Sequence, residues 1–230
     1  MDVLDLFPRS ILRGTLPAPL LKQLIALGEM VLANPSASPD ASPKLAGQLR
    51  QQRELRPDQQ AVQQLTAEHL LPACDRWIRH VMDRQPPQGR GPWVPGRYRL
   101  QMIDLWINCQ TAGDYNPTHT HGGSFSGVIF LKVPPQINGN SFDGQLCFHG
   151  PEDWHLQSFR TGMTHYILPV PGEFYVFPAW QPHSVMPFSG DGERWSLAFN
   201  AVAAPAAAPQ PTSPQGNVSL SSQRPLPRGF

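Results

Sequence analysis

The sequence has little charge, and this shortage excludes several classes of protein. Charged residues make up 15% of the 230 residues, and 18 Lys and Arg balance 17 Asp and Glu, so the formal net charge is +1. With no excess of either sign, no long-range field attracts the chain to nucleic acid or to an anionic membrane surface. We therefore expect neither of these among its partners, and the sequence leaves the oligomeric state open.

Cysteine is also scarce. The three cysteines are Cys74, Cys109 and Cys147. Their number is odd and no two have C-x-x-C spacing, so neither a disulfide framework nor a zinc ribbon is expected. Residues 1–5 lack the basic segment of a secretory signal. Lys22 and Glu29 interrupt the most apolar run, residues 20–33, which is too short to span a bilayer. These features predict a cytoplasmic protein.

Breakers of regular structure are abundant by contrast. The chain has 19 Gly and 27 Pro, about a fifth of its residues, which excludes a coiled coil and predicts many turns. Apolar residues recur at helical spacing in residues 18–33 and again in residues 58–83, where Pro72 predicts a kink. Residues 44–83 as a whole are rich in helix-forming residues. Residues 1–95 are therefore expected to form a helical N-terminal region.

After residue 96 the pattern changes to short segments of strand-forming residues. They are residues 98–109, 126–133, 145–148, 173–177 and 194–202. Short strands separated by long turns are typical of a jelly roll or a related β-barrel. Residues 204–230 contain mostly Pro, Ala, Ser and Gln, which predicts a disordered tail. The expected fold is mainly β with N-terminal helices, in which residues 1–95 pack on a barrel formed by residues 96–203.

Three of the eight histidines are candidate metal ligands. His119 and His121 form a His-x-His pair. Residues i and i+2 of an extended segment point to the same face, so the two imidazoles can bind one ion. His183 follows a predicted strand that a Pro-Gly turn precedes. Strands this far apart in sequence can lie side by side in a two-sheet barrel, which would bring His183 opposite the pair.

A second group of candidate site residues comes from the strand at 194–202. Arg194 and Ser196 share one face of this strand by alternation. The guanidinium supplies two parallel charged donors and the hydroxyl a third, which suits a carboxylate. Asn108 and Asn200 are polar groups in otherwise apolar strands and are candidates to line the same site. Candidates for its apolar walls, which could equally be barrel core, are Trp106, Phe130, Trp180 and Phe199.

Several motifs occur in a fixed order along this part of the chain. They are Trp-Ile-Asn at 106–108, Asn-Pro-Thr-His-Thr-His at 116–121, Ser-Gly-Val-Ile-Phe-Leu at 126–131, Pro-Gly at 171–172, Phe-Pro-Ala-Trp at 177–180, His183, and Arg194-x-Ser196 followed by Phe199-Asn200. Together they resemble the 2-oxoglutarate- and Fe(II)-dependent oxygenases over roughly residues 98–202. The resemblance implies a double-stranded β-helix, a cupin-like jelly roll, with helices packed outside it.

The resemblance also implies roles for single residues. His119 corresponds to the first metal histidine of the family and His183 to the distal one. Arg194 corresponds to the arginine that binds the distal carboxylate of 2-oxoglutarate, and Ser196 to the serine of the Arg-x-Ser motif. Asn108 is expected beside them at the cofactor. The implied activity is a dioxygenase that uses Fe(II), 2-oxoglutarate and O2, releases succinate and CO2, and hydroxylates an unidentified substrate.

One position departs from the pattern of the family. The usual metal motif is His-x-Asp with a distal His, whereas this chain has His121 in the place of the carboxylate. A face of three histidines can hold Fe(II), and the net charge of such a site is one unit more positive than that of a site with Asp. If His121 instead lies outside the coordination sphere, two protein ligands remain. Asp114 and Asp143 are nearby in sequence, but neither has the expected spacing.

Two other functions remain as alternatives. Gly113, five intervening residues and the His119–His121 pair fit the opening of a cupin metal motif, and the Pro-Gly turn before His183 fits its second half. A cupin would have a Glu four or five residues beyond His121, which this chain lacks, and it would give no reason for Arg194 with Ser196. The third possibility is a non-catalytic jelly roll with vestigial histidines, which would not bind iron.

Overall fold

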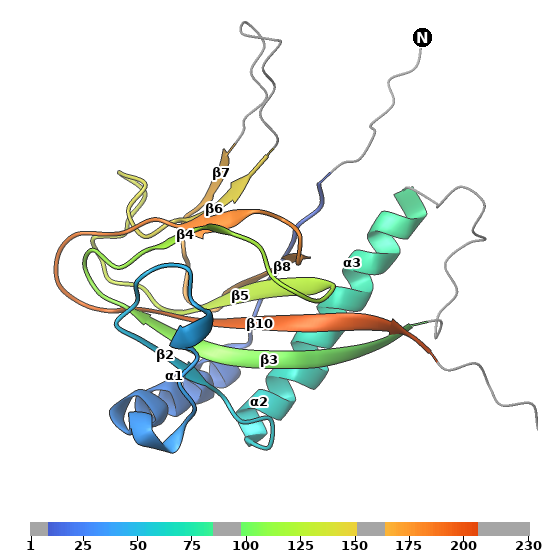
Figure 1. The fold of residues 1–230 in the computed structure, drawn as a ribbon, viewed down its shortest axis with the longest axis horizontal. Coiled ribbons are helices and arrows are strands. Elements are labelled where there is room, and N and C mark those ends of the chain that lie inside the picture. The colour runs from blue at the N-terminus through green and yellow to red at the C-terminus, as the bar shows by residue number, and fades with distance from the viewer. Residues whose placement is uncertain (1–8, 85–97, 151–163, 207–230) are drawn as a thin grey trace, which may run out of the picture.

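The structure, a computed structural model, describes residues 9–84, 98–150 and 164–206. Two antiparallel sheets face each other without closing into a barrel. The six-stranded sheet has the order β1-β8-β5-β10-β3-β2 and the four-stranded sheet the order β4-β9-β6-β7 (Figure 1). The strands are β1 (Leu12–Thr15), β2 (Gln51–Glu54), β3 (Tyr98–Gln110), β4 (Asn116–His119), β5 (Phe125–Lys132), β6 (Leu146–His149), β7 (Thr164–Ile167), β8 (Glu173–Pro178), β9 (His183–Val185) and β10 (Arg194–Pro205). This arrangement is the expected double-stranded β-helix.

The helices lie on one side of the six-stranded sheet (Figure 1). Helix α1 (Ala18–Ala33) confirms the prediction for residues 18–33. The predicted helix at 58–83 is divided into α2 (Gln60–Gln64), a π-helical stretch (Leu65–Leu70) and α3 (Leu71–Arg84). Pro72 is the second residue of α3, two residues after the π-helical stretch ends. Because its nitrogen carries no hydrogen, the backbone cannot continue a regular hydrogen-bond ladder there, and the helix is irregular at the predicted place.

The helical expectation for the segment around residue 51 is wrong. Gln51–Glu54 form β2, which pairs antiparallel with β3, Gln52 opposite Asn108 and Glu54 opposite Trp106. Pairing with an existing sheet edge outweighs the intrinsic preference of Gln, Arg and Glu for helix, which is a weak determinant. The N-terminal region also supplies β1, which pairs with β8. It is therefore a source of edge strands as well as helices.

The five strands predicted from the sequence are all present as β3, β5, β6, β8 and β10, with ends that differ by a few residues. Three short strands, β4, β7 and β9, were not expected, because three or four residues carry too little pattern. The loop expected at 35–43 contains two single turns of 3-10 helix, Pro35–Ala37 and Ser42–Lys44. The breaker at 86–96 and the tail from residue 207 onward lie outside the described residues.

The six-stranded sheet has a core on each face. The outer face packs against the helices and contains Leu105, Ile107, Leu197 and Phe199, all nearly inaccessible. A smaller apolar cluster lies between the two sheets and includes Phe130, Phe148 and Phe177. Beside this cluster the space between the sheets is left open, and the candidate site occupies it. Within the described residues, no helix is long and apolar enough to cross a membrane.

Candidate active site

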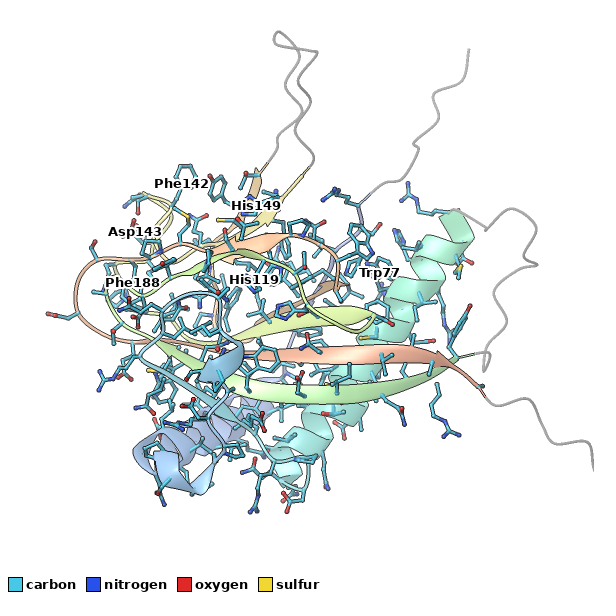
Figure 2. The ribbon with its side chains drawn as sticks, in the orientation of Figure 1. Trp77, His119, Phe142, Asp143, His149 and Phe188 are labelled. Carbon is cyan, nitrogen blue, oxygen red and sulfur yellow. The ribbon has the colours of Figure 1, made fainter. Side chains whose placement is uncertain are left out.

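The three candidate metal histidines converge between the sheets. In the antiparallel pair of β4 and β9, His119 lies directly opposite His183, as the sequence predicted for strands far apart in the chain. His121 follows β4 by two residues, and its backbone N–H donates to the carbonyl of Ala179 at 2.9 Å. One ring nitrogen of each histidine lies within 4.8 Å of the others. Figure 2 shows His119 near the centre of the molecule, between the two sheets.

Backbone carbonyls orient two of the three rings. The Nδ1 of His119 lies 2.7 Å from the carbonyl oxygen of Pro117, and the Nδ1 of His183 lies 2.9 Å from that of Gln181. A carbonyl oxygen only accepts, so each Nδ1 carries the hydrogen and each Nε2 keeps a lone pair. This is the second hydrogen bond that metal-binding histidines usually make.

The remaining nitrogens face one another. The Nε2 of His121 lies 3.2 Å from the Nε2 of His183, and two lone pairs at this separation repel unless a cation or a proton lies between them. Burial first, and the charge of His119 second, lower the pKa of His183 to about 3 and that of His121 to about 4. The pKa of His119 is lowered by burial too. Neutral imidazoles at pH 7 are the form that binds a metal ion.

Neither neighbouring carboxylate joins the histidines. Among the described residues, the three histidines are the group whose nitrogen, sulfur or carboxylate atoms could together hold a metal. The Asp114 carboxylate accepts the backbone N–H groups of Arg50 and Thr111, each at 2.8 Å, and so braces a turn. Asp143 lies well apart from His119, beside Phe142 (Figure 2).

The histidines open onto a cavity of about 530 Å³. Its floor is the inner face of β3 and β10, where four cross-strand pairs follow one another: Arg194 with Gln110, Ser196 with Asn108, Ala198 with Trp106, and Asn200 with Asp104. The predicted alternation on β10 is confirmed, because Arg194, Ser196 and Asn200 line the cavity while Leu197 and Phe199 pack against the helices.

Arg194 lies at one end of this floor and is 1% exposed. Its Nε donates to the carbonyl of Gly144 at 3.0 Å, and one terminal nitrogen donates to the side-chain oxygen of Gln110. The other terminal nitrogen, Nη2, and the Nε2 of Gln110 have no partner among the described residues. Burial lowers the pKa of Arg194 to about 10, so the guanidinium is still charged at neutral pH. Two buried donors and an unpaired cation fit an anionic ligand.

The other predicted cofactor residues lie next to Arg194. Ser196 is buried at the following pair of the floor. Its partner Asn108 lines the cavity as well, and its side-chain oxygen is 2.7 Å from the side-chain amide of Gln52 in β2. Asn108 is therefore held by a neighbouring strand that the sequence did not predict.

Of the four aromatic wall candidates, only Trp106 lines the cavity. Phe130 packs under Arg194, with the guanidinium carbon 5.2 Å from its ring centroid. Phe199 belongs to the outer core and Trp180 is 58% exposed. Phe177, which was not a candidate, lines the cavity and contacts His183 with ring centroids 4.7 Å apart.

Two polar residues of the floor, Gln110 and Asp104, were not among the predicted site residues. Both lie on the same face of β3 as Asn108, so applying alternation to this strand, starting from Asn108, could have found them. Gln110 was missed because the strand was expected to end one residue earlier. Asp104 was missed because no pattern distinguishes a floor carboxylate from one at the rim. Nothing in the sequence indicated that Gln52 or Glu54 would reach the cavity.

Comparison with known proteins identifies this arrangement. Residues 104–200 match the model of a family described as "Putative 2OG-Fe(II) oxygenase". Over this segment the chain is similar to the 2OG-Fe(II) oxygenase family. Fe(II) and 2-oxoglutarate are thus the cofactors of the enzyme, an oxidoreductase of the dioxygenase type, and the family match favours this reading over the cupin. No match is found among curated protein sequences.

Solved structures similar to this oxygenase share its fold. A Pseudomonas putida prolyl-4-hydroxylase is 20% identical with a TM-score of 0.55, and the match covers 84% of this chain and 92% of that one. The α-ketoglutarate-dependent epimerase SnoN from nogalamycin biosynthesis is 15% identical with a TM-score of 0.53, covering 96% and 94%. HygX from Streptomyces hygroscopicus, solved with nickel and 2-oxoglutarate, is 12% identical with a TM-score of 0.52, covering 86% and 84%. At these identities the likeness supports the double-stranded β-helix and says nothing of the substrate.

Proposed function

We propose that the oxygenase hydroxylates a C–H bond of its substrate, with Fe(II) bound by the three clustered histidines and 2-oxoglutarate bound by Arg194. The observation that carries this proposal is the buried Nη2 of Arg194, which lacks a partner and lies in the same cavity as the histidine cluster. A fully buried cation without an anionic neighbour is costly to maintain. A carboxylate of the cofactor supplies the missing partner.

The donor set of the cluster suits iron. Imidazole nitrogens bind Fe(II), and a site with three protein ligands leaves open positions for a chelating ligand and for dioxygen. The convergence of His121 with His119 and His183 within 4.8 Å supports three histidine ligands over two. Because no carboxylate of the described residues joins them, such a site retains the full charge of the ion, which favours a dianionic co-substrate.

The cofactor end of the floor offers more donors than the sequence analysis assigned. Arg194 Nη2 and Gln110 Nε2 are both free to donate, and the hydroxyl of Ser196 adds a third group from the same face of β10. Charge-assisted bonds to a carboxylate are stronger than those between neutral groups. We assign Gln110 to this carboxylate site together with Arg194 and Ser196, with Asn108 bordering it.

When bound, Fe(II) and 2-oxoglutarate supply the oxidative decarboxylation that yields succinate and CO2 and places an oxygen atom in a substrate C–H bond. The protein's own residues bind the two cofactors and shield them from water. The three imidazoles stay neutral because they are buried. Trp106 and Phe177 flank the cluster with apolar surface, which limits the access of water.

The domain boundaries follow from this assignment. We take the predicted residues 96–203 as the catalytic core and residues 1–95 as a region packed on it. Strand β10 continues to Pro205, so the core extends two residues into the segment 204–230 that the sequence predicted as a tail. The N-terminal region is needed for activity because β2 brings Gln52 and Glu54 to the cavity. Three free, buried cysteines fit a reducing compartment, and we place the enzyme in the cytoplasm.

Anaerobic loading tests the function. The full chain, loaded with Fe(II) and 2-oxoglutarate and then exposed to oxygen, should release succinate slowly even without substrate. Calorimetry with Ni(II) and 2-oxoglutarate gives a second readout that needs no turnover. Well-metallated protein that neither binds 2-oxoglutarate nor forms succinate would contradict the proposal, and protein that takes up no metal would favour the non-catalytic jelly roll.

A further inference from the structure

The end of the cavity floor that lies opposite Arg194 has unpaired hydrogen-bond acceptors in place of unpaired donors. There Asn200 of β10 lies directly opposite Asp104 of β3, and both residues line the cavity. One carboxylate oxygen of Asp104 and the side-chain oxygen of Asn200 are buried without a partner among the described residues. Buried acceptors that lack donors are rare in folded proteins and call for a ligand or an ordered water. The floor therefore offers unpaired donors at one end and unpaired acceptors at the other.

A bulge in the sheet creates this acceptor end. The register of β10 against β3 shifts between Asn200 and Ala201, so that Asn200 pairs with Asp104 but Ala201 pairs with Met102. The extra residue, Ile103, lines the cavity next to Asp104. Bulges redirect side chains near binding sites. Here the bulge places an apolar and an acidic side chain on the same wall.

The histidine cluster lies close to the acceptor end. The ring of His121 is 6.1 Å from that of Trp106, and Trp106 pairs with Ala198, one pair before Asn200 on the floor. Arg194 and Asn200 are six residues apart on β10, about 20 Å at ~3.3 Å per residue. A molecule anchored at Asp104 therefore has its next few atoms beside the histidines, while 2-oxoglutarate extends from the other side.

The charge at this end is negative. Among the described residues that line the cavity, Asp104 contributes a carboxylate at this end, and the charge of Arg194 at the other end is matched by the cofactor carboxylate under the proposed function. A ligand that satisfies two acceptors and a net negative charge is an organic cation with several N–H donors. Leu45, Leu49 and Ile103 supply apolar surface next to it.

We propose that Asp104 and Asn200 form the substrate subsite, and that the substrate carries an ammonium or guanidinium group on an apolar stem. This inference rests on the proposed function, because it places the oxidised carbon between the cation and the cofactor. The same chemistry is found in small free amines and in Lys or Arg side chains of polypeptides.

The test uses the full chain loaded with Ni(II) and 2-oxoglutarate. Calorimetry or ligand-observed NMR at low ionic strength compares butylammonium and butylguanidinium with 1-butanol, which has the same butyl stem, and with butyrate, an anion of similar length. We expect one or both cations to bind at least about tenfold more tightly than butanol, since charge-assisted hydrogen bonds are worth more than neutral ones. Equal binding of butanol, or tighter binding of butyrate, would overturn the inference.

Paired variants test whether Asp104 and Asn200 are the residues that bind the cation. Asp104→Asn keeps the shape of the side chain and should remove the preference for cations, whereas Asn200→Asp adds a charge and should strengthen it. Asp191→Asn is the matched control, because Asp191 is exposed and does not line the cavity; it should change nothing. Cation binding that is unaffected by Asp104→Asn would place the cation elsewhere and reject the subsite.

Two further arms separate the possible outcomes. An uncharged-ended pentapeptide with a single central Lys, compared with butylammonium, distinguishes a polypeptide side chain from a free amine as the source of the cation. The affinity for 2-oxoglutarate is measured in every sample. Loss of 2-oxoglutarate binding in the unaltered protein counts against the proposed function, whereas normal 2-oxoglutarate binding without any cation preference counts against the subsite alone.

Discussion

The two faces of the six-stranded sheet are made by the same strands and have opposite properties. On the outer face of β3 and β10, Leu105, Ile107, Leu197 and Phe199 are at most 4% exposed and pack against the helices. On the inner face, the intervening residues are polar or charged except for Trp106 and Ala198. Because successive side chains of a strand alternate, a single stretch of sequence builds a core on one face and a binding site on the other.

The inner face retains polar atoms that a purely structural surface would satisfy. Arg194, Gln110, Asp104 and Asn200 each have a buried side-chain atom without a partner among the described residues, and all four lie on the floor of the cavity. Natural proteins depart from full hydrogen bonding mainly at functional sites. The comparison indicates that the outer face stabilises the fold and that the inner face holds ligands at some expense in stability.

The largest expected effect is a loss of stability from the outer face. Leu197→Ala removes a side chain that is inaccessible to solvent, and a substitution of this kind typically costs about 3–5 kcal/mol of unfolding free energy. Chemical denaturation measures the loss, and calorimetry on the folded protein should give an unchanged affinity for 2-oxoglutarate. A large drop in that affinity with little loss of stability would contradict the assignment of stability to the outer face and of ligand binding to the inner face.

The histidine cluster should show the next largest effect. His183→Ala removes one of three converging ligands, and we expect the affinity for Ni(II) or Fe(II) to fall by at least about a hundredfold, in line with the sensitivity of metal sites to their ligands. Metal titration followed by calorimetry measures this change. His69→Ala, on the π-helical stretch away from the cluster, is the matched control, and an equal effect there would refute the assignment.

Arg194→Ala should affect binding far more than stability. Loss of a charged pair of donors is expected to weaken 2-oxoglutarate binding by about 10- to 100-fold. The unfolding free energy of the ligand-free protein should change little or rise, because an unpaired buried charge is removed. Arg194→Lys, which keeps a charge but loses the planar fork, should be intermediate. Unchanged 2-oxoglutarate affinity in the Ala variant would eliminate this role.

Gln110→Glu should change the stability of the protein and its affinity for 2-oxoglutarate in opposite directions. The new carboxylate pairs with the adjacent Arg194, so the ligand-free protein should gain stability in thermal unfolding. The same carboxylate repels that of 2-oxoglutarate, so binding of the cofactor should weaken by about tenfold. Tighter cofactor binding in this variant would contradict the position that we assign to Gln110.

The smallest effect is expected at the cysteines. Burial raises the pKa of Cys74 and of Cys109 to about 12 and also raises that of Cys147. Only the thiolate reacts, so all three thiols should resist iodoacetamide at pH 8 in the native state and react after unfolding. Mass spectrometry follows the labelling. In Leu197→Ala, Cys109 should be labelled sooner, since it lies on the weakened outer face.

The sequence was sufficient for the features that alternation and motifs specify. The period of two on residues 194–200 separated the inner face from the outer one, and the His-x-His spacing with a distant His183 indicated residues that the structure brings within 4.8 Å of one another. The strands β3, β5, β8 and β10 were identifiable because each is long or strongly apolar.

What the sequence did not reveal depends on pairing between distant segments. Gln51–Glu54 have helix-forming composition, and only the free edge of β3 makes them a strand. The shift in register at Asn200 leaves no trace in composition, so Ile103 and Asp104 could not be placed on one wall. That Arg194 has no acidic partner among the described residues is a property of the assembled cavity and of no local segment.

The order of strands in the six-stranded sheet has a consequence for biosynthesis. β10 lies between β5 and β3, although it is the last strand of the chain to be synthesised among those described. Until residues 194–205 leave the ribosome, β3 and β5 have no shared neighbour and each exposes an unpaired edge, the condition under which nascent chains associate with one another. The same segment carries Arg194, so closure of the sheet and completion of the cofactor site are a single event. A nascent chain that stops short of this strand has neither.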